Sequence, residues 1–224
     1  MTQRRNETVR RSRLTPRLRV CSSITALYAV GKREEASRII REGMQRLSLP
    51  RPMFSELFLH LSLFLGFPAM IDGFETLLAM KPSKKFSKRP NARRTSVRRG
   101  GLTLLTQIYG SQTHRVLRRL DELHPELPER IIDDAYGRIV GRQGLSLRER
   151  EVINVVALAL GGYRRQLYSH IRGAIRVGVH PATLASALVN AERRTGRNLR
   201  SARALLREFA SQRRTKTEAE AARS

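Results

Sequence analysis

The spacing of apolar residues along this 224-residue chain restricts it to helical folds. In most of the sequence, hydrophobic residues recur every three or four positions, which is the period of an α-helix with one buried face. Residues 33–47 show the pattern clearly, with apolar positions at Ile39, Ile40, Met44 and Leu47. No segment alternates apolar and polar residues over the length of a strand. The sequence therefore predicts an all-α protein.

Breaks in this pattern divide the chain into five segments. The first 19 residues carry seven Arg and one Glu, and residues 81–99 carry nine basic residues and no acidic one. Both segments also contain Pro, Ser and Asn, which favour irregular structure. We expect five parts in order: a basic disordered tail at 1–19, a first helical half at 20–80, a basic linker at 81–101, a second helical half at 102–210 and a polar tail at 211–224.

The net charge of +25, from 44 Lys and Arg against 19 Asp and Glu, favours polyanionic partners. Much of this charge lies on the predicted tail and linker, where Phe86 is the only aromatic residue. A non-catalytic helical scaffold whose basic segments bind nucleic acid is therefore one hypothesis, with contacts to the phosphate backbone rather than to bases. Segments that aid solubility and bind nothing specific are the alternative.

Cysteine content and hydrophobicity bear on the compartment. Cys21 is the only cysteine, so no intrachain disulfide and no Cys-x-x-Cys pair can form, which suits a reducing cytosol. No uninterrupted apolar run reaches the roughly 18 residues that a membrane span needs. We therefore predict a cytoplasmic protein without a membrane span. The Arg-rich, acid-poor N-terminus could also mimic an organellar transit peptide.

Two titratable residues, Glu151 and His170, lie on two helices that look buried and are joined by Gly161-Gly162. Glu151 lies ten residues before Gly161, and His170 lies eight residues after Gly162. At 1.5 Å per residue these positions are about 15 and 12 Å from the turn, so an antiparallel helical hairpin places them at similar depth. We expect an acid–base pair if both face inward. Two alternatives require no such pair. Glu151 can be present because the helix dipole favours an acid near the start of a helix, and His170 can be a hydrogen-bonded residue of a partly buried helix.

Residues 136–179, with the sequence YGRIVGRQGLSLREREVINVVALALGGYRRQLYSHIRGAIRVGV, resemble the carboxymuconolactone decarboxylase family, which includes the alkylhydroperoxidase D-like proteins. The motif GLSLR, the Glu151 helix and the motif SHIRGAIRVGV carry the resemblance. Residues 56–74 are similar to the family's other recurrent segment, a Leu-rich helix closed by Gly-hydrophobic-Pro-Ala. The resemblance covers roughly 33–80 and 120–190. It implies an alkylhydroperoxidase D-like helical bundle that assembles as a homo-oligomer.

The peroxidase-linked branch of that family uses the spacing Glu-x11-Cys-x2-Cys-x3-His. Here Glu151 and His170 match, but Tyr163 and Gln166 occupy the two thiol positions, which excludes a disulfide relay at this site. If the chain is classified with the peroxidase-like, alkylhydroperoxidase D-like proteins, it is so without their thiol chemistry. The decarboxylase branch lacks these cysteines too. That resemblance implies a lyase or isomerase acting on a small carboxylated lactone or keto acid, with Glu151 and His170 as the catalytic proton-transfer pair.

Three further residues are candidates for substrate binding. Arg172 could hold a substrate carboxylate, and His60 lies where the family often has a polar residue, although a structural role is the alternative for His60. Phe67 belongs to the Gly-hydrophobic-Pro-Ala element. The histidines show no metal-ligand spacing, and we expect neither a metal nor a cofactor.

The two halves of the chain also share a pattern of amphipathic helix, Pro-containing turn and apolar helix, which favours two degenerate repeats over chance similarity between helical hairpins. Ile39 then falls opposite His170, so the first repeat has no Glu/His pair. The second repeat has lost the Gly-hydrophobic-Pro-Ala element. We therefore expect residues 56–74 to cover the Glu151/His170 hairpin and form one composite pocket with it.

Overall fold

The computed structural model describes residues 14–80 and 93–221, and in this part of the chain all regular structure is helical, as predicted. The elements in chain order are α2 (Pro16–Ala29), α3 (Arg33–Arg46), α4 (Arg51–Met80), α5 (Arg94–Tyr109), η1 (Gly110–Gln112), α6 (Thr113–Leu123), α7 (Leu127–Glu129), the π-helical segment η2 (Arg130–Val140), α8 (Leu147–Leu160), α9 (Arg164–Arg176), α10 (Pro181–Thr195) and α11 (Arg200–Ala221).

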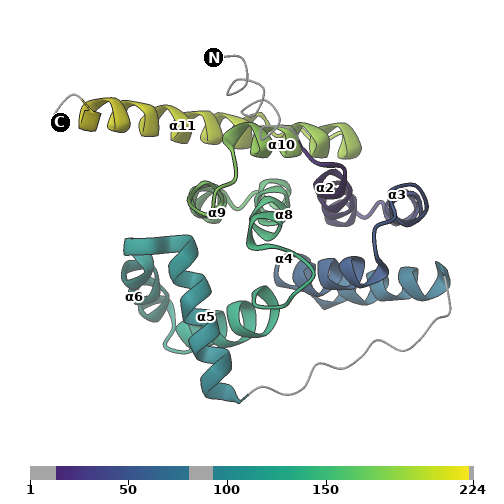
Figure 1. Ribbon diagram of the computed structural model, residues 1–224, viewed down its shortest axis with the longest axis horizontal. Helices are drawn as coiled ribbons and strands as arrows, with labels where there is room; N and C mark the ends of the chain where they lie inside the picture. The colour runs from purple at the N-terminus through teal and green to yellow at the C-terminus, as the bar shows by residue number, and fades with distance from the viewer. Residues whose placement is uncertain (1–13, 81–92, 222–224) are drawn as a thin grey trace.

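The helices α9, α8, α2 and α3 form a row, seen close to end-on in Figure 1. Helices α10 and α11 lie along one side of this row, and α4 lies along the other (Figure 1). Helices α5, α6 and η2 lie beyond α9, on the same side as α4. Within the row α2 packs against α3 and α8, and α8 packs against α9.

Three predicted boundaries differ from the structure. Helix α2 begins at Pro16 rather than at 20, because the Thr15 hydroxyl accepts a hydrogen bond from the Leu18 amide and caps the helix. Helix α5 begins at Arg94, inside the predicted linker. Helix α11 continues to Ala221, inside the predicted polar tail. The rest of the predicted tail and linker, residues 1–13 and 81–92, lies outside the described residues.

Residues 94–101 are helical because α5 has a partner that sequence patterns did not reveal. A Cβ on Gly101 would lie 2.1 Å from the carbonyl oxygen of Ile132, and one on Gly137 would lie 2.6 Å from that of Val97. The two glycines therefore let the backbones of α5 and η2 approach closely, and Val97 is buried in their contact. This packing replaces the expected linker with a helix.

Helix α4 is long and apolar enough, by length and composition alone, to cross a membrane, and no other described helix is. We expected no such run because Gly66 and Pro68 interrupt the apolar sequence. The structure shows that interruption as a kink, with Gly66 at φ 77° between two helical stretches. Before the kink, Phe54, Leu57 and Leu61 are fully buried against the rest of the protein.

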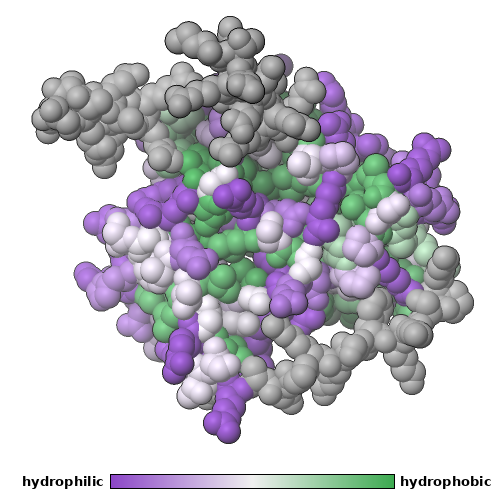
Figure 2. All heavy atoms as spheres, in the orientation of Figure 1, coloured by the Kyte–Doolittle hydropathy of each residue, from purple (hydrophilic) through white to green (hydrophobic). Residues whose placement is uncertain are grey.

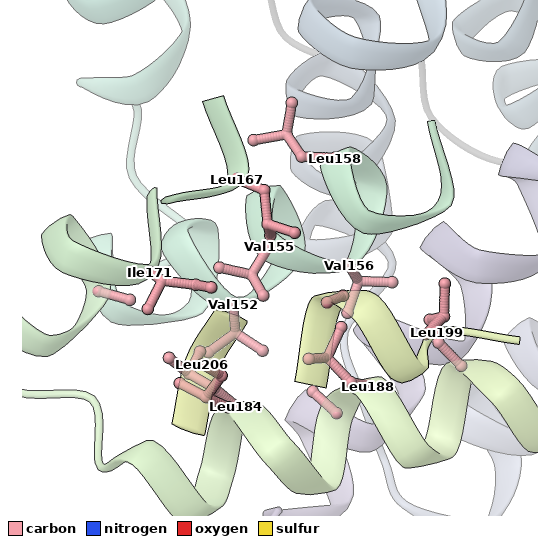
Figure 3. Packing of buried hydrophobic residues seen from close by; sticks show 14 of the residues in the cluster. Val152, Val155, Val156, Leu158, Leu167, Ile171, Leu184, Leu188, Leu199 and Leu206 are labelled. Atoms are coloured by element: carbon pink, nitrogen blue, oxygen red, sulfur yellow. The ribbon is translucent and has the colours of Figure 1, made fainter. Parts of the chain in front are cut away.

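Buried hydrophobic residues form two large clusters, and each cluster draws on both halves of the sequence. The first is built on α8, α9, α10 and α11 and includes Leu18 and Ala26 from α2. Figure 3 shows its centre, where side chains of α8 and α9 meet those of α10 and α11. The second is built on α2, α3 and α4 and includes Ile153 from α8. The predicted halves are therefore one packed unit.

The structure contains the internal repeat. Three pairs of residues, all separated by the same number of positions, have matching roles: the N-caps Thr15 and Ser146, the left-handed glycines Gly31 (φ 78°) and Gly162 (φ 74°), and the prolines Pro50 and Pro181 that precede or begin the third helix. Helices α2, α3 and α4 thus correspond to α8, α9 and α10. Each third helix packs against both repeats, since α4 contacts α2 and α8 and so does α10.

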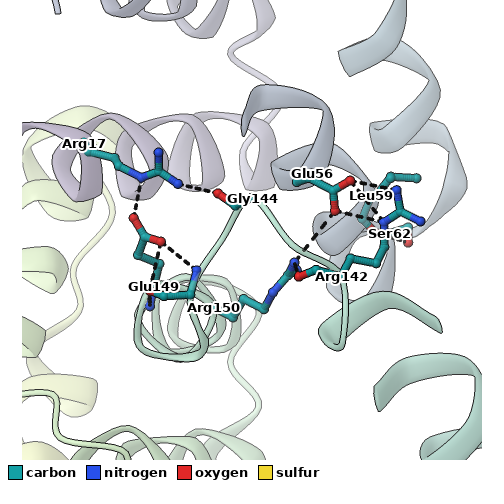
Figure 4. Close-up of polar contacts among 9 residues, drawn as sticks. Arg17, Glu56, Leu59, Ser62, Arg142, Gly144, Glu149 and Arg150 are labelled. Carbon is teal, nitrogen blue, oxygen red and sulfur yellow. Dashed lines mark hydrogen bonds and ion pairs between the residues drawn. The ribbon is translucent and has the colours of Figure 1, made fainter. Parts of the chain in front are cut away.

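Ion pairs hold the repeats together at the start of α8. Arg17 of α2 pairs with Glu149 at 2.5 Å and donates to the carbonyl of Gly144 (Figure 4). Glu56 of α4 accepts from Arg142 at 2.7 Å and lies 3.8 Å from a guanidinium nitrogen of Arg150 (Figure 4). The Arg150 side chain is fully buried, so this carboxylate is the charge that compensates it.

Candidate active site

The turn between α8 and α9 sets the geometry of the site. A capping box starts α8, in which the Ser146 hydroxyl accepts from the Glu149 amide and the Glu149 carboxylate accepts from the Ser146 amide. Gly162 ends the hairpin turn in a left-handed conformation, which costs glycine little. Glu151 and His170 then face each other, with 3.0 Å between His170 Nδ1 and Glu151 Oε2.

The pair is largely withdrawn from solvent. Glu151 is 1% exposed and the side chain of His170 is 12% exposed. The acid–base pair expected from the spacing around Gly161-Gly162 is thus close enough for a direct hydrogen bond. A buried carboxylate requires hydrogen-bond donors, and the residues around Glu151 supply them.

Asn154 and His60 extend the pair into a chain of buried polar groups. Asn154 Nδ2 donates to Glu151 Oε1 at 3.0 Å, and Asn154 Oδ1 lies 2.7 Å from His60 Nε2. His60 comes from α4, so the covering helix reaches the hairpin as expected. Asn154 thus connects His60 to Glu151 through its amide. Asn154 was not among the site residues predicted from the sequence.

Burial lowers the pKa of His60 to about 3, and the nearby Arg150 guanidinium lowers it further. His60 is therefore neutral near pH 7. As a neutral ring it can donate Nε2–H to Asn154 Oδ1, which turns the Asn154 amide hydrogens toward Glu151.

Acid should destabilise the protein through His60. Between the usual pKa of 6.5 and the folded value of about 3, the unfolded chain binds a proton that the folded chain does not, so stability is lost as pH falls. The free energy of unfolding should drop by up to about 1.4 kcal/mol per pH unit from this group. Urea unfolding of a His60→Leu variant, measured from pH 7 to 4, should show a slope shallower by nearly one proton. Replacing the exposed His114 by Gln should leave the wild-type slope, and equal slopes for His60→Leu and wild type would contradict the assignment.

The hydrogen bonds favour one tautomer of His170. Ionised Glu151 accepts from the Asn154 amide through Oε1 and from His170 Nδ1–H through Oε2. With the proton on Nδ1, the other ring nitrogen of His170 keeps its lone pair. This is the arrangement by which a buried carboxylate orients a histidine that acts as a general base in hydrolytic triads. In this arrangement His170 can take up or release a proton at Nε2.

Helices α5 and η2 cover the pair with groups that sequence reasoning missed. A Cβ on Gly173 would lie 2.6 Å from Ile108 and 3.1 Å from Glu151 Oε2, so the absent side chain lets α5 close over the carboxylate. Tyr109 and Tyr136 are hydrogen-bonded to each other, and burial raises the pKa of both, with the Glu151 charge adding to the effect. Both hydroxyls therefore stay protonated. Tyr109 lies outside the stretches that resemble the family, and Tyr136 begins one of them without having been assigned a role there.

A half-open cavity of about 320 Å³ lies beside the pair, at the α8–α9 turn. Tyr163 and Gln166, at the positions of the thiols in the peroxidase-linked branch, line it together with Phe64. Glu151 and His170 are not part of its lining. The Phe64 ring lies between the cavity and His170, since it also meets the His170 ring edge-on at 5.9 Å between centroids.

The remaining candidates lie away from this cavity. Phe67 sits just after the Gly66 kink and is 70% exposed, so it is not part of a composite pocket. The stretch of α4 before the kink covers the pair, because it carries His60 and Phe64. Arg172 is partly buried on α9, two positions after His170, and does not line the cavity. Among the described residues, no cluster of His, Cys, Asp or Glu could hold a metal ion.

Cys21 lies in the core and cannot take over the missing thiol function. It is fully buried on α2, and burial raises its pKa to about 12. Because the thiolate is the reactive form, native protein should react with a disulfide reagent far more slowly than protein unfolded in urea, by about a hundredfold or more. Absorbance of the released thiolate measures both rates. Similar rates in the two states would contradict the buried position.

Two comparisons with known proteins found similarity to this chain. Residues 125–208 match the model of the carboxymuconolactone decarboxylase family, a stretch that holds η2 and helices α8 to α10 with both Glu151 and His170. The chain is also similar to "Peroxisomal protein 2" of Schizosaccharomyces pombe, with 25% identity over 170 residues that cover 74% of this chain and 79% of that protein. The segment that contains the second helical repeat, with Glu151 and His170, is thus the part of the chain that matches the carboxymuconolactone decarboxylase family.

Proposed function

We propose that this protein is a lyase or isomerase that moves a proton on a small carboxylated lactone or keto acid, without a cofactor. The observation that carries the proposal is the 3.0 Å contact between His170 Nδ1 and Glu151 Oε2 inside a sheltered part of the fold. An isolated, unpaired carboxylate would be costly there, and a hydrogen-bonded acid–base pair is a common device for proton transfer.

In a decarboxylation, the bond between the ring carbon and the carboxylate breaks and carbon dioxide leaves. The electron pair moves into the conjugated carbonyl system, and the carbon then takes up a proton. Protonated His170 can deliver that proton from Nε2, while Glu151 stabilises the imidazolium and fixes the ring through Nδ1. In an isomerisation, neutral His170 removes a proton from one carbon and returns it to another. Each reaction needs only the groups that the site contains.

Substrate would bind in the cavity at the α8–α9 turn. Its lining combines apolar groups, among them Leu63, Phe64 and Leu158, with the polar side chains of Tyr163 and Gln166. A lactone ring fits an apolar wall, and the two polar side chains can hydrogen-bond its oxygens. Movement of Phe64 would bring the reacting carbon to His170.

The test is turnover by the purified full chain. A carboxylated muconolactone and a β-keto acid would each be incubated with the protein, and release of carbon dioxide would be followed together with the ultraviolet absorbance of the substrate. The proposal expects release above that of a Glu151→Gln/His170→Gln double variant. No release over that background from either substrate, and no isomerised product by NMR, would contradict it.

Other properties remain predictions. The net charge of +25 favours nucleic acid as a partner in the non-catalytic alternative, and salt-sensitive binding to a polyanion column would support it. Assembly as a homo-oligomer is expected from the family. The cytoplasm is the predicted compartment, and the name of the Schizosaccharomyces pombe relative adds the peroxisome as a second candidate.

A further inference from the structure

A second cavity lies in the first repeat, at the position that corresponds to the Glu151/His170 site. Its volume is about 380 Å³, and it opens between α2, α3 and the end of α10. Three of its lining residues, Val20, Ser23 and Ile39, occupy the repeat positions of Glu151, Asn154 and His170. Equivalent positions of the two repeats thus hold the acid–base pair in the second repeat and line an open cavity in the first.

The two equivalent positions differ in which helices cover them. In the second repeat, Ile108 of α5 reaches Gly173, and Tyr109 and Tyr136 lie near Glu151, so α5 and η2 fill the space. The corresponding space beside α3 holds no helix of the described chain (Figure 1). Figure 2 shows hydrophobic residues at the surface among hydrophilic ones over α2 and α3. The cavity of the first repeat is therefore open to a ligand.

The charges around the cavity of the first repeat also differ from those around the Glu151/His170 position of the second repeat. Arg46 stands where the second repeat has Val177, and Arg194 stands where the first repeat's third helix has Leu63. Arg19 corresponds to the buried Arg150, but the position equivalent to Glu56, the carboxylate that pairs with Arg150, is Ala187.

These substitutions leave three guanidinium groups, of Arg19, Arg46 and Arg194, around the cavity, and none pairs with a carboxylate in the part of the chain that the structure describes. Glu42 is the only acidic residue in the lining. The floor is apolar, with Val20 and Ile39 both buried. An arginine rim above an apolar floor matches a molecule with an anionic head and a hydrocarbon body.

We infer that this cavity is a binding site for a small amphipathic carboxylate. The carboxylate lies among Arg19, Arg46 and Arg194, and the apolar body rests on Val20, Ile39 and Leu47. The site binds its ligand without transforming it, because Val20 and Ile39 have replaced the groups that could move a proton. It is independent of the reaction proposed for Glu151 and His170.

Isothermal titration calorimetry of the full chain with sodium octanoate tests this inference. Octylammonium has the same body with the opposite charge, and acetate has the head without the body. We expect octanoate to bind with a Kd below 1 mM, and both controls to bind about tenfold more weakly or worse. The double variant Arg46→Gln/Arg194→Gln should weaken octanoate binding by about tenfold or more, since it removes two of the three cations.

The matched control is Arg41→Gln/Arg197→Gln, which removes two exposed arginines of α3 and the α10–α11 connection outside the lining. It should keep the wild-type Kd within twofold, and so should Glu151→Gln. An equal loss in the two arginine double variants would reduce binding to general attraction by a basic surface and overturn the inference. Octylammonium bound as tightly as octanoate, or a wild-type chain that binds no octanoate because a second copy covers the cavity, would overturn it too.

Discussion

Replacing His170 by Gln should lower kcat by about a hundred- to ten-thousandfold, the usual contribution of a positioned general acid or base. Gln keeps the polar character of the side chain, so it removes the titrating ring while disturbing the packing against Phe64 little. The loss should fall on kcat more than on KM, because the ring acts on the reacting proton and does not line the cavity.

Glu151→Gln should have a similar but smaller effect, because the amide can still contact Nδ1 yet cannot stabilise the imidazolium. The double variant should lose little more than His170→Gln alone, since the two residues act as one unit. Ser169→Ala changes a partly buried neighbour of His170 on α9 that has no contact with Glu151, and it should retain wild-type rates. Steady-state kinetics with the substrate found active provides the measurement, and an unchanged kcat in both single variants would exclude the pair from the chemistry.

Glu56→Ala should lower the free energy of unfolding by about 3–5 kcal/mol, because it leaves the buried charge of Arg150 without its carboxylate. Burial already lowers the pKa of Arg150 to about 10, the sign of a charge that the interior accepts poorly. Two of its guanidinium nitrogens, Nε and Nη1, have no hydrogen-bond partner, so little else compensates the loss. Arg142 would lose the same partner, although it reaches solvent more easily.

Urea unfolding followed by circular dichroism measures this effect, with Glu122→Ala as the matched control. Glu122 pairs with Arg119 on the surface of α6, where both side chains are about half exposed, and such pairs contribute about 0–1 kcal/mol. A loss in Glu56→Ala no larger than that in Glu122→Ala would show that Arg150 does not depend on this carboxylate.

Helix content and the meeting of Glu151 with His170 could be predicted because both follow from local periodicity. The apolar spacing defines helices, and Gly161-Gly162 fixes the hairpin that brings two distant positions to one depth. The start of α2 at Pro16 was also readable in principle, since Thr15-Pro16 is a helix-start signal, but the surrounding arginines suggested a tail.

The predictions that were wrong or missing concern features that depend on contacts between segments far apart in the sequence. The close approach of Gly101 and Gly137 makes residues 94–101 helical, and no local pattern encodes it. Tyr109 and Tyr136 reach the site through the same contact. Phe67 was misplaced because its exposure follows from the kink at Gly66, where φ is positive, and the sequence indicates only that the helix is interrupted there.

Determination of the His170 tautomer tests the central claim most directly. That claim is that the Glu151 carboxylate accepts a hydrogen bond from His170 Nδ1–H and so orients the ring. Long-range ¹H–¹⁵N NMR spectra of the full chain at neutral pH, assigned with the His170→Gln variant, distinguish the two ring nitrogens directly. The account predicts a proton on Nδ1 and an unprotonated Nε2, and a shift of this pattern in Glu151→Gln. A ring protonated on Nε2, with no response to the Glu151 substitution, would contradict it.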